Sequence, residues 1–208
     1  MSKRIWGGGG VRCYTGLWGS GKTLSMALEC QWLVDRGVEV YTNFGFASET
    51  ASVETFDDLL RLCSAGDRKR RHVALDEMGF LLPARLYNQW PQALNLLFLQ
   101  GRKFGFSLSY SAQAFELVDA NIRRVTGYVC RCRGMGRIKT GDPIEPYRPG
   151  LFIRSWVHGE QAHLAKPDRL SFQVYRAPRD RLYDTHKLIE VAQRQLSEQW
   201  AEIGGKNE

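Results

Sequence analysis

The stretch Gly16-Leu17-Trp18-Gly19-Ser20-Gly21-Lys22-Thr23 decides the fold of this chain. It fits the pattern G-x-x-x-x-G-K-[ST] and stands between a β-like run at 11–15 and an amphipathic helix predicted over 23–36. Glycines let the backbone fold back so that successive N–H groups line a concave nest, and the helix N-terminus adds positive potential. The stretch therefore predicts a loop that binds a polyphosphate, which we call the phosphate loop.

The phosphate loop gives its polar residues separate roles. Lys22 is expected to reach the β- and γ-phosphates, and the Thr23 hydroxyl is expected to coordinate Mg²⁺. No [NT]-K-x-D motif, which would read guanine, is present. The residues predicted to bind the nucleotide are Gly16, Gly19, Ser20, Gly21, Lys22, Thr23 and Leu24.

Two acidic residues end a short apolar run that is typical of a buried strand. The run 72–75 is followed directly by Asp76 and Glu77. A carboxylate at this point of a parallel sheet can hold the metal, so Asp76 is the predicted Mg²⁺ partner. Glu77 is predicted to orient and deprotonate the attacking water. The alternative is that both are ordinary acids of a loop after the strand.

Four further polar residues are candidates for contacting the γ-phosphate or the charge that develops on it. Gln113 follows the strand predicted over 106–111, where a side chain can sense the γ-phosphate or hold the water; a plain loop glutamine is the alternative. Arg102, Arg123 and Arg124 are candidates for neutralising charge in the transition state, and each can also be a helix-end or surface cation.

The order of apolar patterns predicts an α/β domain. Strands and helices alternate through the first 115 or so residues, which is typical of a doubly wound fold with a mostly parallel sheet. Beyond the loop, the predicted elements are a strand at 38–42, a helix from 55, a strand at 72–75, a helix at 91–102 and a strand at 106–111.

The pattern changes after Val125. The β-rich runs 125–133, 151–158 and 171–175 predict an antiparallel extension of the same domain, and 184–203 predicts a C-terminal helix. We expect a flexible N-terminal segment at 1–10 and one domain at 11–208, with its core at 11–125 and its extension at 126–208.

Composition and charge indicate the kind of partner and the cellular compartment to expect. The 208 residues carry 29 Lys and Arg against 22 Asp and Glu, and the resulting net charge of +7 favours polyanionic partners such as nucleic acid. The sequence shows neither a membrane-spanning run nor an apolar signal segment, so an intracellular protein is expected. The five cysteines are odd in number and scattered, which favours reduced thiols; Cys130 and Cys132, with His158 and His163, leave a zinc site open as an alternative.

The combined motifs resemble those of the FtsK–HerA superfamily of DNA-pumping ATPases. The motifs are the phosphate loop, Leu75-Asp76-Glu77, the segment 101–106, Ser111-Ala112-Gln113 with 118–123, and Leu182-Tyr183-Asp184-Thr185. The small size is similar to that of genome-packaging ATPases of tailless, membrane-containing double-stranded DNA viruses. The similarity covers 11–125 well and the remainder weakly.

This resemblance implies a RecA-like core that hydrolyses ATP with Mg²⁺ and a ring of five or six subunits around double-stranded DNA. It also implies an arginine supplied by the neighbouring subunit, for which Arg102 is the first choice and Arg124 the second. The implied partner is a viral capsid or its packaging vertex, and the implied location is the host cytoplasm or the virion at that vertex.

Two other functions stay open. The zonula occludens toxin-like assembly ATPases of filamentous phages share these motifs, but usually carry a membrane-spanning helix after the ATPase domain. A non-enzymatic switch is disfavoured because both Asp76 and Glu77 are present.

The basic segment 131–139 is either a DNA-contacting pore loop or a solvated hairpin. Trp18 is unusual in a phosphate loop, and packing on a ring neighbour or on the nucleotide are the two interpretations.

Overall fold

Short apolar segments form ten strands in the computed structural model, which describes residues 10–64, 69–78, 105–136, 138–139, 147–164, 166–176, 182–184 and 187. The strands are β1 (Val11–Thr15), β2 (Glu39–Thr42), β3 (Ala51–Ser52), β4 (Arg71–Leu75), β5 (Phe106–Ala112), β6 (Thr126–Met135), β7 (Ile138–Lys139), β8 (Tyr147–Arg148), β9 (Leu151–His158) and β10 (Ser171–Tyr175). The helices are α2 (Lys22–Val34), α3 (Phe56–Ser64) and α6 (Ala120–Val125), with short 3₁₀ turns η3 (Phe115–Leu117) and η4 (Gly159–Gln161).

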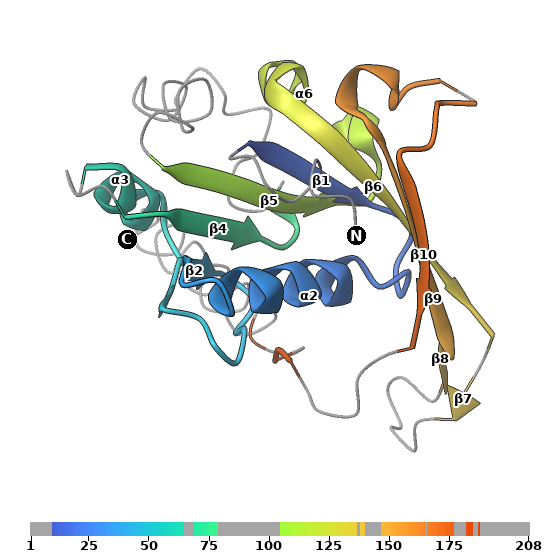
Figure 1. The fold of residues 1–208 in the computed structure, drawn as a ribbon, viewed down its shortest axis with the longest axis horizontal. Helices are drawn as coiled ribbons and strands as arrows, with labels where there is room; N and C mark the ends of the chain where they lie inside the picture. The colour runs from blue at the N-terminus through green and yellow to red at the C-terminus, as the bar shows by residue number, and fades with distance from the viewer. Residues whose placement is uncertain are drawn as a thin grey trace, which may run out of the picture.

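Eight of these strands form one sheet in the order β10-β9-β6-β1-β5-β4-β2-β3, and β7 pairs with β8 in a small separate sheet (Figure 1). Every pair from β6 to β3 is parallel, whereas β9 and β10 are antiparallel. All five residues of β1 and of β4 are buried, as expected for central strands of a parallel sheet. The predicted α/β class with a mostly parallel sheet is confirmed.

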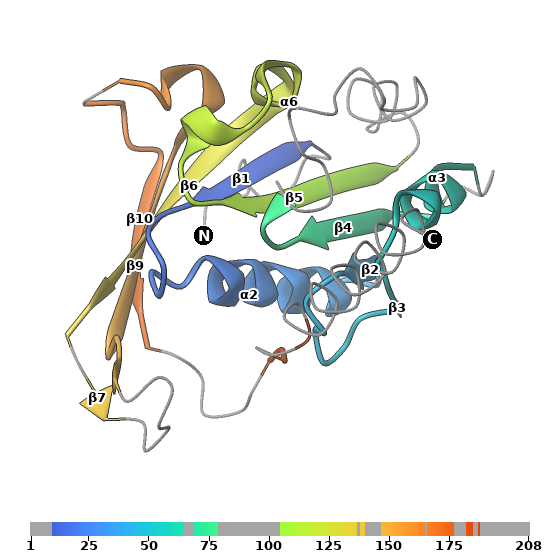
Figure 2. The same cartoon turned by 180° about the vertical axis from the view of Figure 1, so that it is seen from behind.

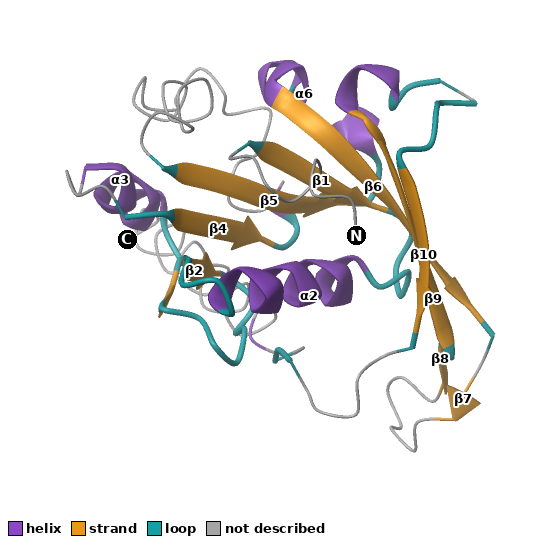
Figure 3. Ribbon diagram, in the orientation of Figure 1, coloured by secondary structure: helices purple, strands orange, loops and turns teal. Residues whose placement is uncertain are grey.

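Helices and 3₁₀ turns cover both faces of the sheet (Figures 1 and 3). On one face α2 packs its buried residues, such as Met26 and Cys30, against Tyr14 and Trp156. On the other face Leu59 of α3 and Ile122 of α6 share a second core with β1 and β5. The view from behind shows the same division, with α6 and α2 on opposite sides of the strands (Figure 2). The phosphate loop connects β1 to α2, the helix that covers one of these faces.

The antiparallel interpretation of 125–133 is wrong in one respect. β6 pairs with β1 in parallel and only its other edge is antiparallel, to β9. The reason is α6, which lies between β5 and β6 and lets the chain return to the amino end of the sheet. Asp119 caps this helix by accepting a hydrogen bond from the Asn121 N–H at 2.8 Å.

The sheet contains strands from both sides of residue 125. We therefore propose, as the sequence predicted, that 11–208 forms one domain. Two predicted helices, 91–102 and most of 184–203, lie outside the described residues, as does most of the N-terminal segment 1–10. In the described part of the tail, Tyr183 forms a β-bridge with Phe46.

A buried polar cluster fixes α2 to the sheet. Glu29 of α2 accepts hydrogen bonds from the Tyr14 hydroxyl at 2.5 Å and the Ser109 hydroxyl at 2.7 Å. The Arg12 guanidinium lies 2.7 Å from its other oxygen. Burial opposes the charge on Glu29, but Arg12, His72 and the two hydroxyls lower its pKa overall. These contacts hold the helix that carries the phosphate loop in one position relative to β1.

His72 makes stability depend on pH. Burial disfavours its charged form and lowers its pKa from 6.5 to about 4. Between these values the unfolded chain binds a proton that the folded chain does not, so the free energy of unfolding falls as pH falls. We expect a loss of about 2 kcal/mol between pH 7 and pH 5 in urea denaturation.

The variant His72→Gln should lose this slope, whatever its stability at pH 7. His158→Gln, which changes a partly exposed histidine, is the matched control and should keep the slope. An unchanged pH dependence in His72→Gln would contradict the assignment.

Candidate functional site: a phosphate loop with two carboxylates

Two glycines of the phosphate loop are required by close packing. Gly16 and Gly21 have φ values of +150° and +85°. A Cβ on Gly16 would collide with the Cys132 carbonyl oxygen, and one on Gly21 would collide with the Phe152 ring. Gly21 also caps α2 in the left-handed conformation, a position that glycine adopts without the steric cost of a side chain. The G-x-x-x-x-G spacing is therefore a requirement of this fold as well as of the nest.

Lys22 is held inside the loop by backbone carbonyls. Its Nζ donates to the Gly16 carbonyl at 3.0 Å and to the Leu17 carbonyl at 3.4 Å, and the residue is buried. The same Nζ lies 3.8 Å from the Glu77 carboxylate. An ammonium group in this position is ready to contact phosphate oxygens at the loop.

Asp76 is fixed at both of its carboxylate oxygens. The Thr23 hydroxyl donates to Oδ2 at 2.6 Å, and the Ser111 hydroxyl donates to Oδ1. Asn43 holds the backbone of Asp76 in both directions, because its amide donates to the Asp76 carbonyl at 2.9 Å and accepts from the Asp76 N–H at 2.7 Å. The ends of α2, β4 and β5 thus meet at one carboxylate.

The donor set at this point fits Mg²⁺. A hydroxyl and a carboxylate are hard oxygen ligands, and Mg²⁺ in nucleotide sites takes only one or two protein ligands beside phosphates and water. Thr23 and Asp76 would hold the ion, which when bound neutralises charge on the β- and γ-phosphates. Asp76 is only 6% exposed, so its orientation does not depend on solvent contacts.

Glu77 has a different environment from its neighbour. Its backbone has φ +47°, in the left-handed region that non-glycine residues seldom adopt, and its N–H donates to the Ser111 hydroxyl at 2.8 Å. The side chain is 45% exposed and points near Lys22. Burial raises its pKa, Lys22 opposes the rise, and Asp76 adds to it. A raised pKa makes Glu77 a stronger base than an ordinary glutamate, which suits proton abstraction from water.

One buried hydroxyl of the phosphate loop makes no hydrogen bond to the described residues. The Ser20 Oγ is buried and has no hydrogen-bond partner among the residues that the structure describes. Buried polar groups are usually satisfied, so an unmet one calls for an unseen polar partner. A phosphate oxygen is such a partner, and Ser20 stands in the middle of the loop.

Of the remaining predicted residues, Gln113 lies next to the phosphate loop and Arg124 lies away from it. Gln113 is adjacent to the loop, since its carbonyl accepts from the Gly16 N–H at 3.3 Å, and its side chain is exposed. Arg124 is exposed on α6, where it lines a cavity beside Val11 at the amino end of β1, away from the loop of the same chain. This position does not contradict a contribution to a neighbouring subunit. Arg102 lies outside the described residues.

Sequence reasoning missed Ser111 and Asn43 as parts of the site. Asn43 directly follows β2 and Ser111 is the last residue but one of β5, so the carboxyl ends of the two parallel strands next to β4 bring them to Asp76. A polar residue at that point was a detectable signal. Its partner was not detectable, because the strand order was unknown.

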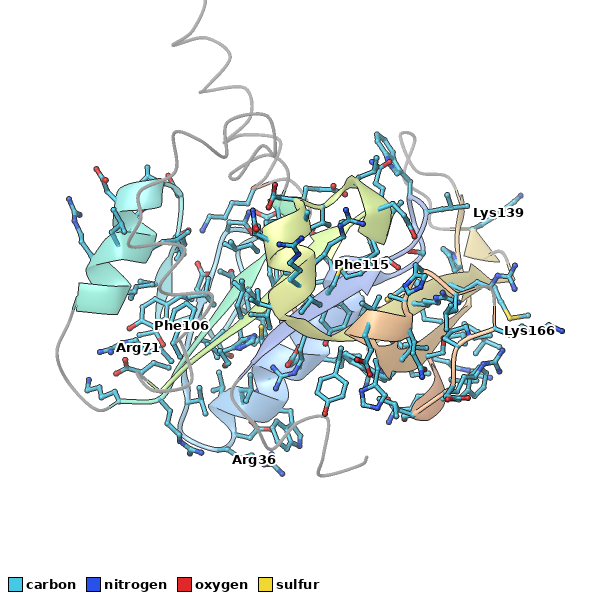
Figure 4. The ribbon with its side chains drawn as sticks, turned by 90° about the horizontal axis from the view of Figure 1, so that it is seen from above. Arg36, Arg71, Phe106, Phe115, Lys139 and Lys166 are labelled. Carbon is cyan, nitrogen blue, oxygen red and sulfur yellow. The ribbon has the colours of Figure 1, made fainter. Side chains whose placement is uncertain are left out.

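A groove runs beside the tip of the phosphate loop and has a volume of about 900 Å³. Leu17 and Trp18, which are 81% and 82% exposed, line it together with Phe172 of β10. Lys139 and Lys166 lie at the same end of the molecule, far from Arg71 (Figure 4). The basic side chains of the groove are Arg131, Arg133, Lys166 and Arg169.

The zinc alternative finds no support in the described part of the chain, which contains no group of three or more potential metal-ligating side chains. His158 and His163 line the cavity beside α6, whereas Cys130 and Cys132 belong to the core beneath α2. The four cysteines whose environment is described, Cys13, Cys30, Cys130 and Cys132, are free thiols.

No protein-family model and no curated protein matches the sequence. Solved structures match well. The N-terminal domain of zonular occludens toxin from Neisseria meningitidis has a TM-score of 0.54 and 16% identity, covering 85% of this chain and 99% of that one. The genome packaging NTPase of Sulfolobus turreted icosahedral virus 2, solved with AMPPCP, has a TM-score of 0.52 and 11% identity, covering 83% and 99%.

The chain has the α/β P-loop fold of these solved structures. A third match is the pCW3 conjugation coupling protein in complex with ATPγS, with a TM-score of 0.51 and 16% identity, covering 89% of this chain and 65% of that one. The matches cover 83–89% of this chain, which is more than 11–125 alone, so part of the β-rich extension is also shared. Two of these three structures were solved with nucleotide analogues, in agreement with the phosphate loop seen here.

Proposed function

We propose that this chain hydrolyses ATP with Mg²⁺. The observation that carries the proposal is the bond between Thr23 and Asp76 at 2.6 Å, with Glu77 beside Lys22 at 3.8 Å. This arrangement would supply a metal site, a phosphate-binding cation and a base within one cluster. The variants Glu77→Gln and Lys22→Met test the base and the cation.

We further propose that hydrolysis drives double-stranded DNA into a preformed viral capsid. Two observations support this proposal. The match to the viral packaging NTPase covers 99% of that protein, and this chain has a net charge of +7. The exposed Leu17 and Trp18 of the phosphate loop support a ring of five or six subunits, because apolar side chains at a nucleotide site favour contact with a neighbour. The capsid's packaging vertex and the host cytoplasm are the proposed setting.

DNA should stimulate hydrolysis through cations of the segment 131–139. Replacing both Arg137 and Lys139 with alanine should lower DNA-stimulated hydrolysis and leave basal hydrolysis unchanged. The slope of log affinity against log salt should become shallower by about 2, because two phosphate contacts are lost. Steady-state phosphate release with linear double-stranded DNA, together with DNA binding at several salt concentrations, measures both effects.

Arg36→Ala with Arg61→Ala removes two exposed cations from elsewhere on the molecule and is the matched control. It should behave like the parent chain. Equal stimulation in the parent chain and in the Arg137/Lys139 variant would exclude this segment as the DNA contact.

The match to the toxin domain favours a second candidate, an assembly ATPase that acts on protein at a membrane. None of the helices described is both long enough and apolar enough to cross a bilayer. Under this alternative, basal hydrolysis would be insensitive to DNA at low salt. A DNA-stimulated rate that vanishes in Glu77→Gln would favour the DNA motor.

A further inference from the structure

Cys130 and Cys132 form a close thiol pair that the proposed catalytic site does not use. They are two residues apart on β6, so both side chains face α2, and their Sγ atoms lie 3.8 Å apart. Cys130 is fully buried and Cys132 is 7% exposed. Both belong to the core that contains Met26 and Ala27 of α2.

The pair lies directly behind the phosphate loop. The Cys132 thiol lies 3.6 Å from the hydroxyl of Ser25, which is in the first turn of α2, two residues after Thr23. The Cys132 carbonyl packs against Gly16 so closely that a Cβ there would collide with it. Between the two cysteines, β6 pairs with Thr15, the last residue before the loop. Movement of Cys132 therefore displaces groups that position the loop.

The two thiols differ in acidity. A hydrogen bond from the Cys130 thiol lowers the pKa of Cys132; burial opposes this, and Ser25, Arg154 and Lys22 add to the lowering. Burial raises the pKa of Cys130. A more acidic thiol 3.8 Å from a less acidic one is the arrangement in which the first sulfur reacts with an oxidant and the second resolves the product.

We propose that Cys130 and Cys132 are a redox modification site, which a peroxide converts to a reversible disulfide that slows nucleotide hydrolysis. The Cys132 thiolate attacks one oxygen of hydrogen peroxide, which gives a sulfenic acid and releases water after protonation. Cys130 sulfur then attacks the sulfenic sulfur, and hydroxide leaves with the Cys130 proton as a second water. Two thiols are oxidised and one peroxide is reduced. Only the effect on hydrolysis rests on the proposed ATPase function.

Geometry makes this disulfide reversible. Cα atoms two residues apart on a strand are separated by about 6.7 Å, near the upper limit for a disulfide. Because β6 is held on both sides by β1 and β9, it cannot shorten freely. A strained disulfide is more readily reduced than a relaxed one. Closing the Sγ atoms from 3.8 Å to about 2 Å also draws Cys132 away from Ser25.

Tryptic mapping tests disulfide formation without reference to activity. Trypsin cleaves after Arg131, between the two cysteines, so a disulfide leaves two peptides joined, whereas free thiols leave two separately alkylated peptides. After treatment of the full chain with hydrogen peroxide and alkylation under denaturing conditions, we expect the joined peptides, and dithiothreitol should separate them. Cys13 and Cys30 are internal controls, because burial raises the pKa of each and both should remain alkylatable.

Hydrolysis should fall about tenfold or more in the oxidised chain, since displacements of about 1 Å near a reacting centre can lower rates about 100-fold. Dithiothreitol should restore the rate. Cys132→Ser and Cys132→Ala lack the sulfur that reacts first with peroxide, so they should neither form joined peptides nor lose activity reversibly, and two variants guard against a folding defect in one. Absence of joined peptides, or joined peptides with an unchanged rate, would overturn the switch. A parent chain that forms the disulfide but never hydrolyses ATP would instead overturn the proposed function and, with it, the regulatory role.

Discussion

Replacing Glu77 with glutamine is expected to lower the turnover number for ATP hydrolysis by about a thousandfold, the range in which a lost general base falls. The glutamine keeps the size of the side chain and leaves the backbone bond to Ser111 in place. ATP affinity should change little, because the phosphates are bound by the loop and by Lys22. Phosphate release under steady-state conditions and equilibrium binding of a fluorescent ATP analogue separate the two quantities.

The pH profile gives an independent readout for Glu77. A base acts when deprotonated, so hydrolysis in the parent chain should fall as pH falls through the Glu77 pKa, which lies above its usual value of 4.5. This limb should disappear in Glu77→Gln. Glu116→Gln, at an exposed glutamate of η3, is the matched control and should retain both rate and profile. Full activity in Glu77→Gln would remove the base assignment and leave only the nucleotide site.

Replacing Lys22 with methionine is expected to weaken ATP binding by about 10- to 100-fold and to abolish measurable hydrolysis. A charge-assisted hydrogen bond is worth about 1.5–3 kcal/mol, and this corresponds to the expected change in affinity. Methionine fills similar volume, but it cannot replace the contacts of Nζ with the carbonyls of Gly16 and Leu17. Calorimetric titration with ATP and Mg²⁺ measures the affinity.

Lys69→Met is the control, because Lys69 is 61% exposed and pairs with Glu39 at the other end of the sheet. It should bind and hydrolyse ATP like the parent chain. A thermal melt of Lys22→Met within a few degrees of the parent would assign the lost affinity to the missing ammonium group. Unchanged affinity in a folded Lys22→Met chain would contradict the phosphate-binding role.

Local patterns were sufficient for the fold class and for naming the residues of the candidate site. The phosphate loop carries its own glycines, lysine and threonine in one contiguous stretch, so its geometry is encoded locally. Asp76 and Glu77 were detectable because they directly follow an apolar run, 72–75, that is typical of a buried strand. Their roles, like those of Gln113 and the arginines, stay predictions that the variants above test.

The periodicity of apolar residues does not predict which distant segments come into contact. The parallel partner of β6 depends on which strand lies next to it, and the short α6 that makes parallel pairing possible has too few residues for a clear pattern. Ser111 and Asn43 reach Asp76 only because β5 and β2 are both neighbours of β4. The contact between Cys132 and Ser25, which are 107 residues apart in the chain, is what brings the Cys130–Cys132 pair next to the phosphate loop.

The sequence by itself determined that this protein has a phosphate loop, an acidic pair after a buried strand and an alternating α/β core, because each depends on neighbouring residues. Only the tertiary structure decided which carboxylate Thr23 contacts, what holds that carboxylate in place and what packs behind the loop. The physical reason is that strand order joins residues far apart in the chain, and a single sequence records side chains but not which strands are adjacent.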